Sequence, residues 1–121
     1  MDKHELENRL INFSVRIIQL IKSLPDDITC KTISNQIVRS GTSSALNYGE
    51  AQSAESKRDF IHKLKIVLKE LRETLICLEI IKRANLTTKI LLHELIKENN
   101  ELISIFVRSI STAAKKNKNQ K

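Results

Sequence analysis

Apolar residues recur along the chain in alternating steps of three and four, the spacing of one face of an α-helix. The first such seam consists of Leu6, Leu10, Phe13, Ile17, Leu20 and Leu24. Pro25 follows and ends this helix, because proline cannot donate to the helical hydrogen-bond ladder. Asp26 or Asp27 then offers an N-cap for a second helix. We therefore expect helices over about residues 3–24 and 27–52.

The second half of the chain has the same periodicity. A third seam consists of Phe60, Leu64, Val67, Leu71, Leu75 and Leu78. A fourth consists of Leu92, Leu95, Asn99, Leu102, Phe106 and Ile110. Asn99 interrupts this last seam, where one polar residue can specify register at some cost in stability. With Ser53 as a cap for the third helix, we expect helices over about 54–84 and 87–112.

Short connections between four long helices predict an all-α fold, an antiparallel up-down-up-down four-helix bundle over residues 1–112. A chain of 121 residues is long enough for one domain with a modest core. Only 2 Gly and 1 Pro are present, too few for the turns of a many-stranded fold.

The second predicted helix carries two parallel stripes. A core stripe consists of Ile33, Ile37, Ser40, Ser44, Tyr48 and Ala51. A wholly polar stripe consists of Gln36, Arg39, Ser43, Asn47 and Glu50. Its side chains pair by directed hydrogen bonds, so we interpret it as a packing or oligomer-contact feature in which Arg39, Asn47 and Glu50 bond to other helices or to a neighbouring subunit. A hydrated surface is the alternative. Gly41, Ala45 and Gly49 add a line of small residues that another helix could approach closely.

A basic row follows the third predicted helix and consists of Arg58, His62, Lys65, Lys69 and Arg72. These five positions lie within about 80° of the helical wheel and span about 21 Å. Such a row could follow a nucleic-acid backbone, where each neutralised phosphate adds a salt-sensitive contribution. A solvated face is the alternative, and Asp59, Glu70 and Glu73 lie beside the row in sequence and dilute its charge. The few aromatic residues read as core, which argues against sequence-specific single-strand recognition.

The net charge of +7 is concentrated towards the end of the chain. Residues 113–121 contain lysines and no acidic residue, at Lys115, Lys116, Lys118 and Lys121. We expect this segment to be a disordered basic tail, because it has no apolar anchor. Such a tail serves either as a contact to nucleic acid or an anionic surface, or as a solubilising end.

Enzymatic and metal chemistry have little support in the sequence. A ferritin-like metal site needs Glu-x-x-His on two helices, whereas Asp59-x-x-His62 has no second copy. No P-loop, dinucleotide fingerprint or nucleophile elbow occurs, so we expect neither a cofactor nor an enzyme.

Cys30 and Cys77 form no disulfide or metal framework and fit a reducing cytoplasm. No apolar run approaches about 18 residues, so we expect no contact with a membrane.

A helix-turn-helix is an alternative for the second predicted helix, with its turn at Ser40-Gly41-Thr42 and a recognition helix after it. Both stripes of that helix continue through Gly41 without a change of phase. The pattern therefore favours one continuous helix.

Residues 36–74, QIVRSGTSSALNYGEAQSAESKRDFIHKLKIVLKELRET, resemble the core of the 23S rRNA intervening-sequence protein family. The matching pieces are Gln36-Ile37-x-Arg39-Ser40, Ser43, Asn47-Tyr48-x-Glu50-Ala51, Ala54-Glu55-Ser56-Lys57 before Phe60, and Leu68-Lys69-Glu70 before Glu73. In one departure, Gly49 and Ala51 invert the family's commoner Ala-Glu-Gly ending.

The resemblance implies an antiparallel four-helix bundle, a ring-shaped homo-oligomer (pentameric where seen) and no known enzymatic activity. Members of the family are encoded within intervening sequences of 23S rRNA genes. Our leading hypothesis is a non-enzymatic basic protein that binds structured RNA or other nucleic acid through backbone charge. The alternative is an accessory subunit that docks onto a protein partner, as similar basic bundles do with the reverse transcriptases of retroelements.

Overall fold

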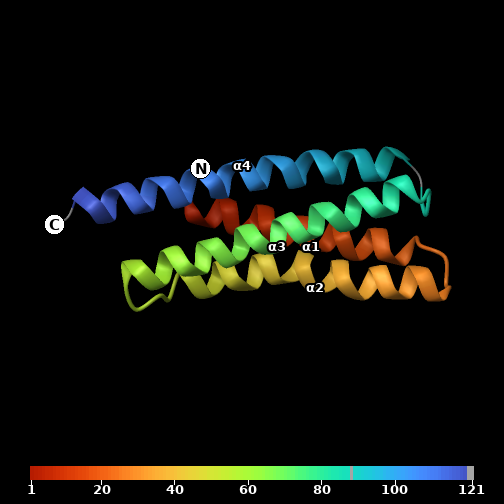
Figure 1. Ribbon diagram of the computed structural model, residues 1–121, viewed down its shortest axis with the longest axis horizontal. Helices are drawn as coiled ribbons and strands as arrows, with labels where there is room; N and C mark the ends of the chain where they lie inside the picture. Colours follow the sequence, from red (N-terminus) through yellow and green to blue (C-terminus); the bar gives the residue numbers. More distant parts are fainter. Residues whose placement is uncertain (88, 120–121) are drawn as a thin grey trace.

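The computed structural model describes residues 1–87 and 89–119, and they form four long α-helices. These are α1 (Lys3–Lys22), α2 (Ile28–Ala51), α3 (Lys57–Arg83) and α4 (Lys89–Asn119). Successive helices lie beside one another and run in opposite directions along the long axis of the bundle (Figure 1). The predicted all-α four-helix bundle is confirmed, and α2 is one continuous helix through Gly41 rather than a helix-turn-helix.

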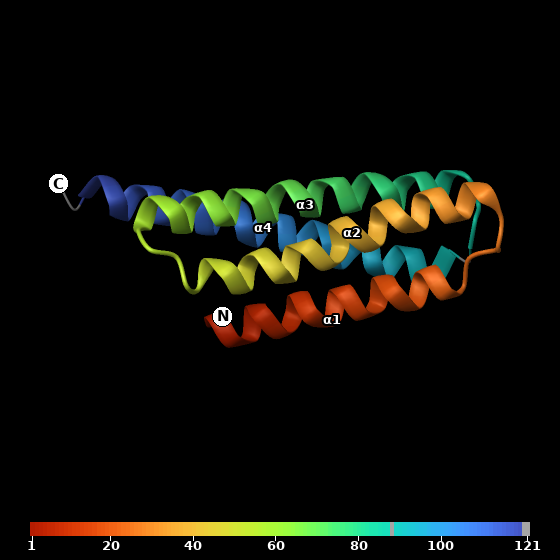
Figure 2. The ribbon, with the colours of Figure 1, turned by 90° about the horizontal axis from the view of Figure 1, so that it is seen from below.

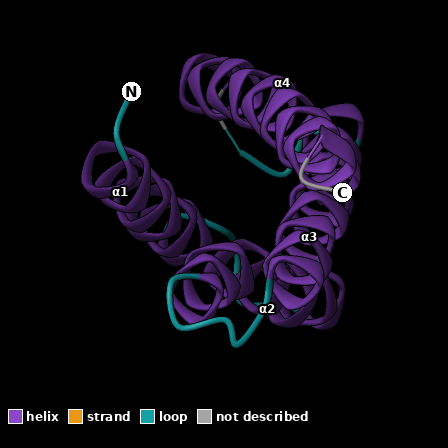
Figure 3. Ribbon diagram, turned by 90° about the vertical axis from the view of Figure 1, so that its left-hand side faces the viewer, coloured by secondary structure: helices purple, strands orange, loops and turns teal. Residues whose placement is uncertain are grey.

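The helices form an arc in chain order. Seen from below, α2 lies between α1 and α3 (Figure 2). Seen along the bundle, α1 and α4 are the two ends of the arc (Figure 3). Consecutive helices pack extensively, whereas α1 and α4 make the least extensive contact. Arg9 of α1 bridges this last pair, since its guanidinium donates two hydrogen bonds to Glu98 of α4, at 2.8 and 2.7 Å.

Side-chain caps fix where three helices begin. Asp2 accepts a hydrogen bond from the Glu5 amide at 2.9 Å, and Asp27 accepts one from the Cys30 amide at 2.8 Å. Of the two candidate caps for α2, the structure therefore uses Asp27. Ser56 caps α3, so this helix begins later than the predicted residue 54. The reason is that the chain through Ala54 still bonds back to the last turn of α2.

The ends of α3 and α4 are set by local backbone preference. Asn85 follows α3 with φ of 54°, a left-handed conformation that asparagine tolerates better than most residues. The amide of Leu86 then bonds to the Ile81 carbonyl at 3.1 Å. α4 continues to Asn119, beyond the predicted end at 112. The segment expected to be a separate disordered tail from 113 is thus helical to 119, because alanine and lysine are strong helix formers. Residues 120–121 lie outside the described residues.

Most predicted seam residues are buried, and the two exceptions in α3 are Phe60 and Leu75, which are half-buried. Thr74 is fully buried, whereas Leu75, which we placed in the seam, is half-buried. Thr74 faces α2, where its hydroxyl donates to Ser40 Oγ at 2.8 Å. Two further bonds link neighbouring helices, from Ser14 Oγ to the Gly41 carbonyl at 3.1 Å and from Asn99 Nδ2 to the Leu71 carbonyl at 3.0 Å. A polar layer therefore crosses the middle of the aliphatic core.

Candidate nucleic-acid interface

The basic row lies on the outer face of α3, opposite the side that packs into the core. All five of its side chains are exposed: Arg58, His62, Lys65, Lys69 and Arg72. The row is straight because it follows one face of an unbroken helix. A straight row of cations can contact several phosphates in succession.

Two of the acids that we expected to dilute this row are turned away from it. Glu70 is only 7% exposed, and Arg39 of α2 reaches across to it with Nη1 at 3.3 Å from Oε2. The same guanidinium contacts Glu73 Oε2 at 2.6 Å. The hydrogen bond with Glu73 is the main cause that raises the pKa of Arg39, so this counter-charge is permanent. The α2–α3 contact therefore holds both carboxylates on the α2 side, where one guanidinium offsets one of their two negative charges. These acids dilute the row less than we expected.

No side chain of the basic row takes part in an ion pair within residues 1–87 and 89–119, where the ion pairs involve other residues. The third neighbouring acid, Asp59, is half-buried at the start of α3. Its Oδ2 accepts a hydrogen bond from the Glu55 amide at 3.3 Å. The Lys and Arg side chains of the row are consequently available to an external anion.

The polar stripe of α2 makes contacts within the chain at three of its five positions. Besides Arg39, Glu50 bonds to Lys63 of α3 at 3.2 Å. The Asn47 amide instead donates to the Ser43 carbonyl of its own helix at 2.8 Å, while Gln36 is exposed. Bonding to another helix, as we proposed for the stripe, therefore occurs at Arg39 and Glu50.

Of the four lysines in the expected basic tail, Lys115, Lys116 and Lys118 fall on α4, and Lys121 lies outside the described residues. Lys115 is exposed. For Lys116 and Lys118 only the helical backbone is described. Their positions extend α4 beyond the first residue of α3, at the end of the bundle where the basic row begins (Figure 1).

Within the described ranges, no three His, Cys, Asp or Glu side chains come together in a way that could hold a metal ion. None of the four helices combines the length and apolar character needed to cross a membrane.

The sequence reasoning missed two features of this region. One is the pairing of Arg39 with buried Glu70, which has no linear signature because the two residues come from different helices. The other is a set of side chains around the start of α3, including Lys57 and Arg108, that surround a pocket. No linear spacing connects these two cations, because they come from helices that meet only in the fold.

Comparisons with known proteins agree on one family. The model of a family described as 23S rRNA-intervening sequence protein matches residues 3–108. The chain is similar to a crystal structure, at 1.70 Å resolution, of a protein of unknown function from the S23 ribosomal protein family of Bacteroides thetaiotaomicron. The two are 34% identical, the match covers 92% of this chain and 99% of that chain, and the TM-score is 0.84. No curated protein matches this chain.

Proposed function

This chain belongs to the 23S rRNA-intervening sequence protein family, and we propose that it is a non-enzymatic protein that binds structured RNA through the basic row of α3. The row contacts the phosphate backbone and not the base edges, so binding depends on the shape and charge of the RNA rather than on its sequence. Duplex DNA offers a similar phosphate spacing and is a second ligand of the same surface.

One observation carries this proposal. Every side chain of the row is exposed, while Glu70 and Glu73 on the same helix are held by Arg39 on the α2 side. A merely solvated helix face mixes acids and bases so that neighbouring charges compensate one another. Here the compensating acids are withdrawn into a helix–helix contact, and the outer face of α3 keeps its positive charge.

We also propose that the protein assembles as a homo-oligomer, as the family resemblance implies. α1 presents an apolar stripe to solvent in steps of four and three, at Ile11, Val15 and Ile18, which are 45%, 44% and 38% exposed. On α2, the space beside Gly49 is open, since an added Cβ would meet no atom within 4 Å. A second copy that covered these surfaces would bury the stripe and would repeat the basic row several times around the assembly.

A protein partner is the second candidate. The outer face of α3 continues beyond Arg72 with Ile76 and Ile80, which are 62% and 49% exposed. An apolar patch beside a basic row suits a partner that combines apolar and acidic side chains. A reverse transcriptase of a retroelement is one such partner, in keeping with the alternative drawn from the sequence.

The test is binding of a structured rRNA fragment, and of duplex DNA, between roughly 50 and 300 mM salt. With four phosphate contacts, affinity should fall on the order of 100-fold between roughly 50 and 200 mM. A variant with Arg58→Glu, Lys65→Glu, Lys69→Glu and Arg72→Glu should lose most of the affinity.

A matched control variant distinguishes an effect of the row's position on affinity from an effect of the protein's net charge. The variant Lys3→Glu, Lys22→Glu, Lys31→Glu and Lys82→Glu has the same net charge but reverses exposed lysines outside the row. It should bind more tightly than the row variant, with unchanged helicity by circular dichroism. Equal losses in the two variants would assign binding to net charge alone. Absence of binding by the unaltered protein at low salt would exclude RNA and DNA and favour the protein partner.

A further inference from the structure

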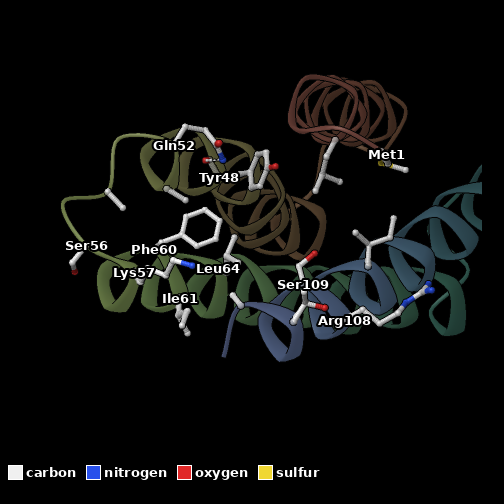
Figure 4. Close-up of a pocket in the computed structure, with 16 residues that line it drawn as sticks. Met1, Tyr48, Gln52, Ser56, Lys57, Phe60, Ile61, Leu64, Arg108 and Ser109 are labelled. Atoms are coloured by element: carbon white, nitrogen blue, oxygen red, sulfur yellow. Dashed lines mark hydrogen bonds between the residues drawn. The ribbon is translucent and has the colours of Figure 1, made fainter. Parts of the chain in front are cut away.

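A pocket opens at the end of the bundle where α2 ends and α3 begins (Figure 4). Its volume is about 860 Å³, and all four helices contribute to its lining. Leu6, Tyr48 and Leu64 are buried at its base, at 7%, 6% and 1% exposure. Side chains at its mouth are exposed, among them Gln52 and Thr112. An apolar base below a polar mouth is the usual form of a small-molecule or single-residue binding site.

Two aromatic side chains line this pocket. Tyr48 is held in place by Phe106, with ring centroids 5.5 Å apart and an interplanar angle of 87°. Phe60, from the first turn of α3, is half-buried and lies near Tyr48 in the close-up (Figure 4). Aromatic side chains on a rigid base can stack against another planar ring. Phe13, Tyr48 and Phe106 are core side chains as expected, whereas Phe60 is half-buried at the pocket.

The charged side chains that line the pocket are cations. Burial is the main cause that raises the pKa of Tyr48, and the carboxylates of Glu7 and Asp2, outside the lining, contribute to raising it. Lys57 and Arg108 line the pocket and are exposed, and no Asp or Glu is among the lining residues that the structure describes. Neither cation takes part in the ion pairs of the described chain. Lys57 is the first residue of α3, so the positive end of the helix dipole adds to the charge at the mouth. An anionic occupant is favoured.

The pocket adjoins the beginning of the basic row. Lys57 and Ile61 line it, and each immediately precedes a member of the row, Arg58 and His62. An RNA backbone lying along the row would therefore reach the pocket at the start of α3. Elsewhere in the lining, the hydroxyls of Ser109 and Thr112 and the Oε1 of Gln52, whose Nε2 donates to the Tyr48 carbonyl, offer hydrogen bonds to the edge of a base.

We propose that the pocket binds one nucleoside phosphate, an unpaired nucleotide of structured RNA, with its base against Phe60 and Tyr48 and its phosphate at Lys57, which lies beside Phe60 (Figure 4). This proposal rests on the proposed function and deepens it. Paired stretches of the RNA contact the row through their phosphates, and a bulged or terminal nucleotide leaves the stack and enters the pocket. Recognition is then for an unpaired position beside a helix, which is how proteins commonly read RNA.

The experiment compares two RNA hairpins that differ only by a single-nucleotide bulge. The unaltered protein should prefer the bulged hairpin by about fivefold or more, the effect of stacking one base on an aromatic side chain. Phe60→Leu keeps an apolar side chain but removes the ring, and it should abolish this preference. Lys57→Gln changes an exposed residue with little risk to folding and should reduce the preference. Neither variant should alter affinity for the fully paired hairpin.

Failure of this inference can be told apart from failure of the proposed function. Equal binding of the two hairpins by the unaltered protein would overturn the pocket assignment and leave backbone binding by the row intact. A second outcome would also overturn the pocket assignment and leave backbone binding by the row intact. In it, the charge-reversed variant of the basic row loses binding to both hairpins, while Phe60→Leu has no effect on the preference. Binding of neither hairpin would overturn both proposals.

A second arm distinguishes the two sources of a nucleotide. Each of the four nucleoside monophosphates is titrated into the protein, and the NMR signals of the Phe60 and Tyr48 rings are followed. Weak perturbation of these rings together with a preference for the bulged hairpin supports the RNA source. Saturable binding of a free monophosphate without that preference would overturn it in favour of a free nucleotide.

Discussion

At the scale of single residues, Asp27 determines where α2 begins. Its carboxylate accepts the hydrogen bond of the Cys30 amide, and this bond is the main cause that lowers the pKa of Asp27 below its ordinary value. A carboxyl group with a lowered folded-state pKa stabilises the fold above its unfolded pKa of about 3.9 and loses that contribution as the pH falls through the folded value.

Asp27→Asn should therefore weaken the pH dependence of stability without removing the cap, because asparagine also caps helices well. Below about pH 4 the melting temperatures of Asp27→Asn and the unaltered protein should converge. Asp27→Ala should melt lower than both at neutral pH. Thermal unfolding followed by circular dichroism between pH 2.5 and 7 measures all three. A difference between the unaltered protein and Asp27→Asn that stayed constant over this range would contradict the assignment.

Asn99 is the second residue whose behaviour can be tested. It is fully buried, its Nδ2 donates to the Leu71 carbonyl, and its Oδ1 has no hydrogen-bond partner among the described residues. A buried polar atom without a partner costs about 1–3 kcal/mol, more than one ordinary hydrogen bond returns. Asn99 therefore lowers stability while it links α4 to α3.

Replacing Asn99 with leucine, which fits the aliphatic seam, should raise the free energy of unfolding by about 1 kcal/mol. Urea denaturation measures the change. Asn100→Leu is the matched control, since Asn100 is exposed on the same helix, and it should leave stability nearly unchanged. A loss of stability in Asn99→Leu would show that Oδ1 is satisfied in solution.

At the scale of the helix pair, two glycines of α2 have opposite surroundings. A Cβ added to Gly41 would lie 3.2 and 3.3 Å from the γ-carbons of Ile17 on α1, whereas one added to Gly49 would meet nothing within 4 Å. Ile17 is fully buried and has little room to move. Gly41 therefore permits the close approach of α1 to α2, while Gly49 has no such role within the chain.

Alanine at each position separates helix propensity from packing. Gly49→Ala should raise the free energy of unfolding by about 0.5–1 kcal/mol, because alanine is the better helix former. Gly41→Ala should lower it, because the contact with Ile17 outweighs that gain. Denaturant unfolding of both variants at a protein concentration where the assembly state is unchanged gives the comparison. Equal stabilisation by the two substitutions would contradict the packing role of Gly41.

These elements also mark how far the sequence predicts the structure. Helix number, order and most seam residues follow from periodicity, because burial repeats with the turn of the helix. The exchange of Leu75 for Thr74 in the seam could not be predicted, because it depends on Ser40 facing that position from another helix. The early start predicted for α3 arose from choosing Ser53 over Ser56, and local capping chemistry allows either.

Part of the candidate site can also be predicted from the sequence, and part depends on the fold. One helix holds the basic row, so spacing alone predicts it. The withdrawal of Glu70 and Glu73 depends on Arg39, and the pocket depends on side chains of all four helices that converge at one end of the bundle. Such convergence from different helices has no linear signature and needs the fold.

At the scale of the whole molecule, the exposed apolar stripe of α1 is where assembly can be tested. Ile11, Val15 and Ile18 occupy one outer face of a helix whose opposite side packs into the core. If a second copy covers this stripe, the assembly buries these side chains, and a charge at the centre of the stripe would be placed in an apolar contact. Burying an unpaired charge is costly unless the group is neutralised.

Val15→Glu should therefore lower the assembled mass towards the 13.9 kDa of a single chain, while its helical content stays the same because position 15 is exposed in the monomer. Ile90→Glu is the matched control, since Ile90 is 83% exposed near the start of α4 and lies outside the stripe. It should keep the mass of the unaltered protein. Size-exclusion chromatography with light scattering measures all three proteins at one concentration. A retained oligomer in Val15→Glu would place the interface on another face, and loss of assembly in Ile90→Glu as well would point to a general effect of added negative charge.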